Sequence, residues 1–495
     1  MLNMTYRPAF AVLLAALVTT HAALAQADAP MDAQAQAQHV LNRLAFGPRP
    51  GDVERVTRMG VRRWIDEQLH PETIPLPPDL ATRLAQLDTV NQSAGESLDE
   101  FVELRREVRM EDEGARQRRR EAAQRASQQA AEARLWRAVE SPRQLEEVMV
   151  DFWYNHFNVF SGKGVDRALV VSYERDAIRP YALGSFRALL GATAKHPAML
   201  FYLDNAVSSA PRPDARAKAR GLNENYAREL MELHTLGVDG GYTQRDVTEL
   251  ARMLTGWTFD QRRLVNKGET FRFDAGRHDD GAKTWLGHAI APSGQQEGEY
   301  ALDVLAMHPA TARHVSRELA RYFVSDDPPP ALVDRMAATW LASQGDMRAV
   351  LATLFASREF MAAGTAGAKF KTPYQFVVSA VRAAAVPVTN VEPLVGALNQ
   401  LGMPLYGCQT PDGYRNTQDA WLNPDALTRR IAFVTALAAG RLPLTPQGDA
   451  PPLDPVRVQA TLAGSVSART LGIVQRNPDN LRAAMLLGSP DFMQR

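Results

Sequence analysis

The chain lacks the residues for several common kinds of site. It has a single cysteine, Cys408, among 495 residues, which excludes an internal disulfide framework and any site built on several cysteines. The chain also has a formal net charge of zero, because 56 Lys and Arg residues balance 56 Asp and Glu residues. A protein that coats nucleic acid or an anionic membrane needs an excess of basic residues, so no nucleic-acid partner is expected. With no His or Lys near it in the sequence, Cys408 is predicted to be a small buried residue and not a reactive thiol.

Long hydrophobic runs are absent after the N-terminus, and the one near the start is short. Arg7 precedes an apolar run over residues 9–18, and Ala23-Leu24-Ala25 follows. This order is typical of a secretory signal peptide with a cleavage site after Ala25. The run is shorter than the roughly 20 residues that cross a bilayer, although a retained N-terminal anchor is the alternative. We therefore predict a signal peptide at residues 1–25 and, over residues 26–495, a soluble periplasmic or secreted protein without a transmembrane segment.

Apolar residues recur at helical spacing through most of the remaining chain. Helices are expected over residues 39–44 and 53–69. Ser141-Pro142 predicts the start of another helix, with serine as the cap and proline in the first turn, and this helix runs to Phe157. Thr243 and an acidic residue three positions later predict a capping box at a further helix start.

One segment breaks the helical pattern. Phe271-Arg272-Phe273 alternates, Asp279-Asp280-Gly281 has turn chemistry, and Thr284-Trp285-Leu286 is mostly apolar again, which predicts a small β-hairpin. The predicted fold class is therefore all-α in the main, as a multi-helix globular array with one small β-hairpin around residues 270–287. Residues 26–495 are expected to form a single large helical domain.

A long polar stretch lies inside this predicted domain. Residues 103–137 contain ten Arg residues and no Lys, with Ala and Gln between charged positions. Seven Asp and Glu residues offset the basic charge, so a nucleic-acid-binding arm is not favoured. The stretch has few apolar positions to bury, which predicts an Arg/Glu-rich helical insertion in the form of a solvated helix or helical hairpin.

Familiar catalytic motifs are also missing. The chain has no Gly-x-Ser-x-Gly elbow, P-loop, dinucleotide fingerprint or Cys-x-x-Cys-His haem site. No two histidines are three to five residues apart, the spacing of many zinc ligands. Any metal site would therefore need ligands from distant segments.

The densest polar segment is residues 223–237. On a helix, Asn225, Arg228, Glu229 and Glu232 would share one face. Two carboxylates, an amide and a guanidinium could serve acid–base chemistry or hold a cation. The alternative is an ion-paired helix face, with Arg228 bridging to Glu232. The candidate catalytic residues are Glu224, Arg228, Glu229 and Glu232.

Three histidines are the candidate metal ligands, and the implied cofactor is a divalent metal. His156 lies beside aromatic residues on the helix that ends at Phe157, His234 follows the acidic face, and His278 precedes two Asp residues at the predicted hairpin tip. A packed histidine is the alternative for His156, and ordinary turn chemistry is the alternative for His278.

Several segments resemble a large bacterial family, domain of unknown function 1800. The matching stretches are residues 39–51, 152–157, 223–237, 242–257, 278–287, 308–312, 371–373 and 411–415. The resemblance covers nearly the whole mature chain. It implies an exported protein, and it implies a partner in another exported protein of alkaline-phosphatase-like fold. It implies no settled activity.

Two functions of different classes remain open. The first is an accessory or scaffold protein of the bacterial envelope that works with another exported protein. The second is a periplasmic hydrolase or metal-assisted enzyme. In it, the carboxylates Glu224, Glu229 and Glu232 and the three candidate metal ligands converge on one cleft as acid, base or ligands.

Overall fold

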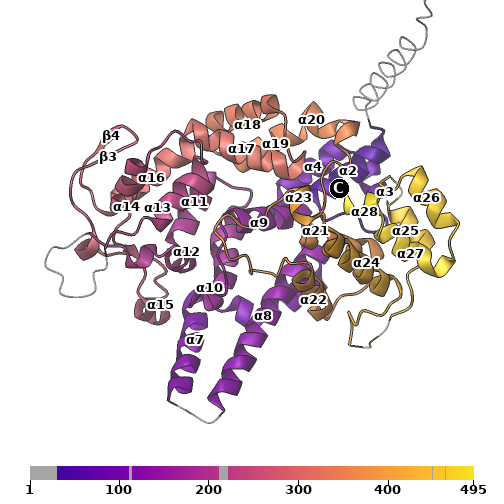
Figure 1. Ribbon diagram of the computed structural model, residues 1–495, viewed down its shortest axis with the longest axis horizontal. Helices are drawn as coiled ribbons and strands as arrows, with labels where there is room; N and C mark the ends of the chain where they lie inside the picture. Colours follow the sequence, from indigo (N-terminus) through magenta and orange to yellow (C-terminus); the bar gives the residue numbers. More distant parts are fainter. Residues whose placement is uncertain (1–30, 111–113, 211–220, 447, 449, 463) are drawn as a thin grey trace, which may run out of the picture.

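The computed structural model describes residues 31–110, 114–210, 221–446, 448, 450–462 and 464–495. Most of these residues lie in helices, so the predicted all-α class is confirmed. The helices form an elongated body, and one pair of long helices projects from it (Figure 1). None of the helices in the described ranges is both long and apolar enough to cross a membrane. The predicted signal peptide lies outside the described residues.

The first part of the chain, up to residue 207, consists of helices of very different lengths. They are α2 (Ala33–Leu44), α3 (Asp52–Met59), α4 (Val61–Leu69), η1 (Pro71–Thr73), α5 (Pro78–Ala85), α6 (Asp88–Asn91), α7 (Ala94–Arg109), α8 (Ala115–Glu140), α9 (Gln144–His156), α10 (Asp166–Ser172), η2 (Tyr173–Ile178), η3 (Arg179–Tyr181), α11 (Phe186–Lys195), α12 (Pro197–Tyr202) and η4 (Asn205–Val207). The helix predicted over residues 53–69 is two helices, because Gly60 has a φ of 90° between them. Ser141 ends α8 and does not start the next helix, which begins at Gln144.

The second part begins with short helices and ends in a helical C-terminal region. Its helices are α13 (Asn225–Glu229), η5 (Leu230–Thr235), α14 (Gln244–Met253), α15 (Gln261–Lys267), η6 (Ala275–Arg277), α16 (Gln295–Met307), α17 (Pro309–Phe323), α18 (Pro330–Ala342), α19 (Met347–Phe355), α20 (Arg358–Met361), η7 (Ala363–Thr365), α21 (Pro373–Ala384), α22 (Glu392–Gln400), α23 (Gln418–Trp421), α24 (Pro424–Ala438), α25 (Pro455–Leu462), α26 (Ala468–Gln475), α27 (Asp479–Leu487) and α28 (Pro490–Met493). The predicted capping box is confirmed at α14, where the Thr243 and Asp246 side chains each accept a hydrogen bond from the other residue's backbone N–H.

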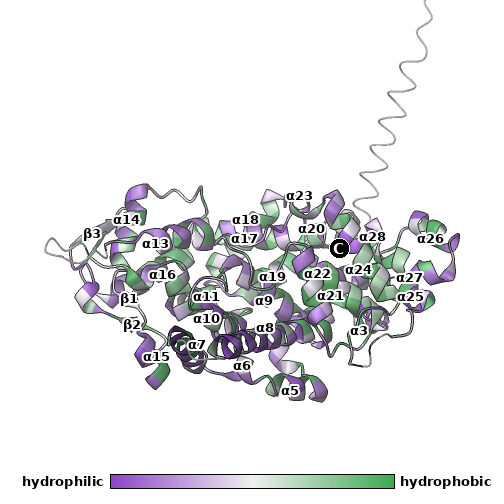
Figure 2. Cartoon of the chain, turned by 60° about the horizontal axis from the view of Figure 1, so that its bottom comes forward, coloured by the Kyte–Doolittle hydropathy of each residue, from purple (hydrophilic) through white to green (hydrophobic). Residues whose placement is uncertain are grey.

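Helices α7 and α8 contain the polar stretch of residues 103–137. They form a helical hairpin that projects from the body (Figure 1), and hydrophilic residues cover most of it (Figure 2). The start of α8 is mostly exposed, whereas Ala131, Leu135 and Val139 near its end are buried in the core. Helix α8 therefore joins a solvated arm to the interior.

The strands pair differently from the predicted β-hairpin. Strand β2 (Arg272–Phe273) pairs with β1 (Trp257–Thr258), and β3 (Lys283–Trp285) pairs with β4 (His288–Ile290). Two separate antiparallel sheets therefore replace the single hairpin. Leu286 and Gly287 both have positive φ, 48° and 77°, and form the tight turn between β3 and β4. The prediction treated Leu286 as a strand residue and so placed the turn too early.

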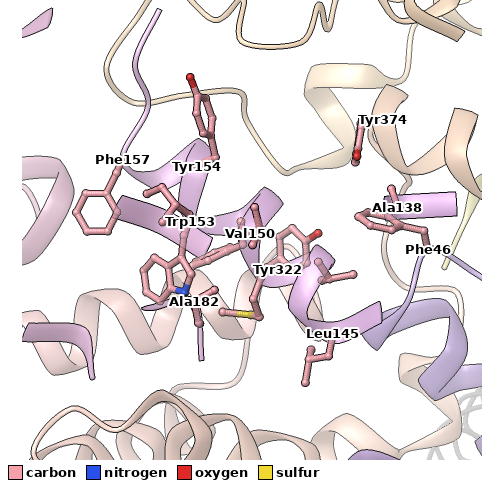
Figure 3. Packing of buried hydrophobic residues seen from close by; sticks show 14 of the residues in the cluster. Phe46, Ala138, Leu145, Val150, Trp153, Tyr154, Phe157, Ala182, Tyr322 and Tyr374 are labelled. Carbon is pink, nitrogen blue, oxygen red and sulfur yellow. Dashed lines mark hydrogen bonds between the residues drawn. The ribbon is translucent and has the colours of Figure 1, made fainter. Parts of the chain in front are cut away.

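The hydrophobic core surrounds α9. Trp153 is fully buried, its indole N–H donates to the Ala182 carbonyl at 2.9 Å, and its ring stacks on Phe157 (Figure 3). These contacts fix the apolar face of α9. Asp151 and Asn155 lie on another side of the same helix, so the packing also fixes their positions.

Candidate functional site

A cleft of about 430 Å³ lies between the end of α9, the side of α17 and the loop that precedes α23. We call it the polar cleft, and its lining residues are Asp151, Phe152, Asn155, His156, Glu318, Arg321, Tyr322, Thr372, Met403, Asp412, Tyr414, Arg415, Asn416, Thr417 and Asp419. Residues 152–157, 371–373 and 411–415, on which the family resemblance partly rests, each contribute to it. Segments more than 200 positions apart in the chain therefore meet in one cleft.

Asp151 connects the polar cleft to a buried ionic network. The Arg134 guanidinium donates to Asp151 Oδ1 at 2.7 Å and to Glu174 Oε2 at 3.1 Å, and the Tyr406 hydroxyl also donates to Glu174. Burial raises the pKa of Asp151, although Arg134 opposes the shift. Burial alone would also raise the pKa of Glu174, but Arg134 and Arg179 outweigh it and the pKa is lowered. The network holds the Asp151 carboxylate in one orientation at the cleft.

Asn155 of α9 and Asn158, the second residue after that helix, hold the loop that forms another wall. The Asn155 amide donates to the Tyr414 carbonyl at 2.9 Å and accepts from the Tyr414 N–H at 2.7 Å. Asn158 donates to the carbonyl of Cys408, which is buried as predicted. A Cβ at Gly413, where φ is 69°, would lie 2.3 Å from the Asn155 carbonyl oxygen, so only glycine allows this close approach.

Three histidines gather around the π-helical turn η5. The ring centroid of His156 lies 6.1 Å from that of His234 and 6.5 Å from that of His314. His156 donates through Nε2–H to the His234 carbonyl at 3.1 Å, and His314 donates to the Leu233 carbonyl at 3.2 Å. A π-helical turn disrupts the regular helix ladder and recurs at functional sites. These carbonyls accept hydrogen bonds from side chains of α9 and α17.

His156 is the histidine that lines the polar cleft. Burial and, to a smaller extent, His314 lower its pKa to about 3, so the ring is neutral near pH 7. Because Nε2 carries the proton in its bond to the His234 carbonyl, Nδ1 is the acceptor nitrogen. No protein group in the described residues donates to this Nδ1. His156 can therefore accept a hydrogen bond from a ligand.

Glu224 and Arg228, two of the predicted catalytic residues, stabilise the contact between α13 and α14. Arg228 pairs with Glu224 at 3.1 Å, and not with Glu232 as the ion-paired alternative proposed. Glu224 also accepts hydrogen bonds from Gln244 at 2.8 Å and from Thr248 at 2.7 Å. Neither residue lines the polar cleft.

Glu229 and Glu232, the other two predicted catalytic residues, do not line the polar cleft, but Glu229 is influenced by a residue that does. The pKa of Glu229 is raised by burial first, then by the negative charges of Glu232 and of Asp412, which lines the cleft. Charges affect one another more strongly the nearer they are. Glu229, Glu232 and Asp412 therefore form an acidic group beside the cleft.

The structure brings together two of the three predicted metal ligands, His156 and His234, and places His278 in another group. The His278 ring contacts the Thr255 carbonyl at 2.9 Å and Glu297 Oε1 at 3.1 Å, and Lys283 pairs with Glu297 at 2.7 Å. Across the described part of the chain, no group of three or more His, Cys, Asp or Glu residues is arranged to hold a metal ion. His278 instead belongs to a buried ionic cluster beneath β3.

Two parts of the site were not predicted from the sequence. One is Arg134, and the other is the wall that α17 forms with its residues Glu318, Arg321 and Tyr322. Arg134 stands at the end of the Arg-rich stretch, where its sequence context resembles that of its exposed neighbours. A separate signal was present in residues 411–415, which carried the family resemblance but received no role. Burial of a charged side chain depends on partners from other segments, so spacing alone could not identify Arg134.

A comparison with protein families agrees with the resemblance noted from the sequence. The model of the family described as Protein of unknown function (DUF1800) matches residues 39–494. No curated protein and no solved structure matches the chain. The matched range includes every residue that lines the polar cleft and every predicted site residue.

Proposed function

The chain belongs to the family Protein of unknown function (DUF1800), and from that premise we propose that it is an exported accessory protein that binds a carbohydrate-like, hydroxyl-rich ligand in its polar cleft. The observation that supports this proposal is the mixture of groups in the cleft. Carboxylates, guanidiniums, two amides and two threonine hydroxyls line it, together with the aromatic rings of Phe152, Tyr322 and Tyr414. A few oriented polar groups beside aromatic surface are typical of a small-ligand site.

The charges of the cleft favour a neutral, hydroxyl-bearing ligand over a phosphate-rich one. Four carboxylates line it against two guanidiniums, and one guanidinium, that of Arg321, already pairs with Glu318 at 2.7 Å. A polyanion would be repelled by the acidic excess. Hydroxyl groups can donate to carboxylates and to the neutral His156 ring, and can accept from Arg415.

The state of His156 favours binding over catalysis. A general base works best when its pKa lies near the working pH. Since burial lowers the pKa of His156 to about 3, its ring is a weak base but still a good hydrogen-bond acceptor. Asp151 is held by Arg134 and is equally suited to orienting a ligand.

Calorimetric titration with cellohexaose, maltohexaose and chitohexaose tests this proposal. We expect at least one of them to bind, and Asp412→Ala to weaken that binding about tenfold, since a hydrogen bond to a charged group contributes about 1.5–3 kcal/mol. Asp239→Ala is the matched control, because Asp239 is exposed and does not line the cleft. Absence of binding to all three sugars, or an equal loss in both variants, would overturn the proposal.

A hydrolase is the second candidate, and the raised pKa of Glu229 favours it. A carboxyl with a raised pKa next to other carboxylates resembles the acid and base pair of glycoside hydrolysis. In that case Glu229 would be the acid, with Glu232 or Asp412 as its partner. Release of p-nitrophenol from p-nitrophenyl glycosides tests this: Glu229→Gln should lower the rate by about 100-fold or more. Unchanged turnover in Glu229→Gln would exclude Glu229 from the chemistry.

Export to the periplasm or beyond is part of the proposal and is supported by the N-terminal sequence. We expect the mature protein to begin at Gln26, which N-terminal sequencing of the protein from its native host would show. A mature protein that starts at Met1 would contradict export through this signal.

The accessory role implies a partner, for which the family resemblance suggests another exported protein of alkaline-phosphatase-like fold. Co-purification of the two proteins at native salt would support this partnership. Failure to form a complex when both are present at micromolar concentration would count against it.

A further inference from the structure

A second cavity lies in the helical hairpin, away from the polar cleft. It has a volume of about 390 Å³ and lies between α7, α8 and α10, with α10 at the base of the hairpin (Figure 1). We call it the hairpin groove. On α7 its lining residues are spaced at helical intervals, with Phe101, Leu104 and Val108 forming an apolar stripe. On α8 and α10 small residues face it, including Ala123 and Ala168.

The groove remains open because small side chains stand opposite large ones. The alanines of α8 do not extend far enough to cover the apolar stripe of α7, so Phe101, Leu104 and Val108 stay partly exposed. Water in such a groove contacts apolar surface, which is unfavourable. A hydrocarbon chain would displace this water, and the volume lies within the usual range for ligand pockets.

Four arginines surround this apolar surface: Arg116, Arg119, Arg120 and Arg167. A single carboxylate, that of Glu100, lines the groove with them, and it accepts a hydrogen bond from Gln92. Other arginines of the hairpin have acidic partners, such as Arg118 with Glu107 at 2.9 Å. For the four groove arginines, the described residues provide no ion pair. Within the described residues, apolar surface and arginines without ion pairs therefore occur together in the groove.

We propose that the hairpin groove binds an anionic amphiphile, a single hydrocarbon chain that carries a phosphate or carboxylate head group. The chain lies against Phe101, Leu104 and Val108, and the arginines bind the head group by charge-assisted hydrogen bonds. A long peptide helix fits less well, because a volume of about 390 Å³ suits a small ligand and is too small for several helical turns. This site is separate from the polar cleft and does not depend on the function proposed for it.

Calorimetric titration of the full chain, with ligands below their micelle concentration, tests this inference. Dodecyl phosphate is the main probe, and laurate tests whether a carboxylate head group suffices. Tetraethylene glycol monododecyl ether, dodecyltrimethylammonium and inorganic phosphate separate the contributions of chain and charge. We expect dodecyl phosphate to bind at least tenfold more tightly than the neutral and cationic amphiphiles, and decyl phosphate to bind about tenfold more weakly than dodecyl phosphate, because each buried methylene contributes.

Two double variants locate the site. Arg119→Ala with Arg120→Ala removes two groove arginines and should weaken binding of dodecyl phosphate by about tenfold or more. Arg105→Ala with Arg109→Ala is the matched control, since both residues are exposed on α7 and do not line the groove. Ala123→Phe, which fills the groove without changing its charge, should also weaken binding.

Several results of these titrations would each overturn the proposed amphiphile site. Tight binding of inorganic phosphate alone would show an anion site that needs no chain and would overturn the inference. Equal binding of all three head-group charges would show non-specific adsorption and would overturn it too. Absence of dodecyl phosphate binding, or an equal loss in both double variants, would also refute it.

Discussion

Replacement of Arg134 by methionine offers a sharp test of the ionic network beside the polar cleft. Arg134 is the cation that Asp151 and Glu174 share, at 2.7 and 3.1 Å, and all three side chains are at most 11% exposed. Its guanidinium also lies over the rings of Tyr154, Tyr374 and Tyr406 at 5.1–5.3 Å. Methionine fills a similar volume but leaves two buried carboxylates without this partner. Removing one partner of a buried ion pair lowers the free energy of unfolding by about 3–5 kcal/mol.

The pH dependence of the same variant provides a second, independent readout. In the wild-type protein the pKa of Glu174 is lowered, so its contribution to stability is present above the pKa of the unfolded chain and is lost as the pH falls. Without Arg134, burial acts on Asp151 without this opposing charge, and on Glu174 with Arg179 still opposing it, so the pKa of both carboxyls should rise. Their protonated forms are then favoured in the folded state. The deficit of Arg134→Met should therefore be smaller at pH 5 than at pH 8.

Urea unfolding followed by tryptophan fluorescence measures both effects. Arg429→Met is the control, because the Arg429–Asp425 pair is on the surface and its loss should cost about 0–1 kcal/mol. The double variant Arg134→Met with Glu174→Gln should recover part of the lost stability, since it removes one of the two buried carboxylates that have lost Arg134. A deficit below about 1 kcal/mol, or one that grows toward pH 5, would refute the reasoning.

Three further substitutions test local features. Lys283 pairs with the buried Glu297 carboxylate at 2.7 Å. Lys283→Met removes this cation, so urea unfolding should show a free energy of unfolding lower by about 3 kcal/mol or more. A loss like that of a surface pair would contradict a buried charge cluster. Thr243→Ala removes the cap that bonds Asp246 and should cost about 1 kcal/mol by calorimetry, and an unchanged melting temperature would argue against the cap. Gly237→Ala introduces a Cβ at a φ of 82° and should cost about 1–3 kcal/mol in thermal unfolding, whereas a neutral effect would mean that the turn relaxes freely.

Local features of the fold followed from the sequence, because their partners are near in the chain. The capping box of Thr243 needs only a residue three positions later, and helical periodicity is visible within a few turns. The small sheets were harder to predict, since strand pairing depends on which residues make the turn. Leu286 looked like a strand residue, and only its positive φ in the folded chain shows that it belongs to the turn between β3 and β4.

The candidate site was harder still to predict from the sequence, because its residues contact partners from distant parts of the chain. The sequence placed His156 beside aromatic residues on one helix, but its partner, the His234 carbonyl, comes from another part of the chain. Glu224 and Arg228 had the right residue types for chemistry, yet they bond to each other and to α14. Residue type and spacing do not reveal whether a charged face meets solvent, a ligand or a neighbouring helix.

By itself, the sequence determined the all-α class, the absence of a disulfide framework and the family, because composition, periodicity and motifs are properties of the linear chain. Only the tertiary structure decided that Asp151, Tyr322 and Arg415 line one cleft and that Arg134 is a buried cation while many of its neighbours in the Arg-rich stretch are exposed. The physical reason is that burial and charge pairing are set by contacts between distant segments. Burying a guanidinium costs free energy unless carboxylates from other helices pair with it, and these pairs form only in the folded protein.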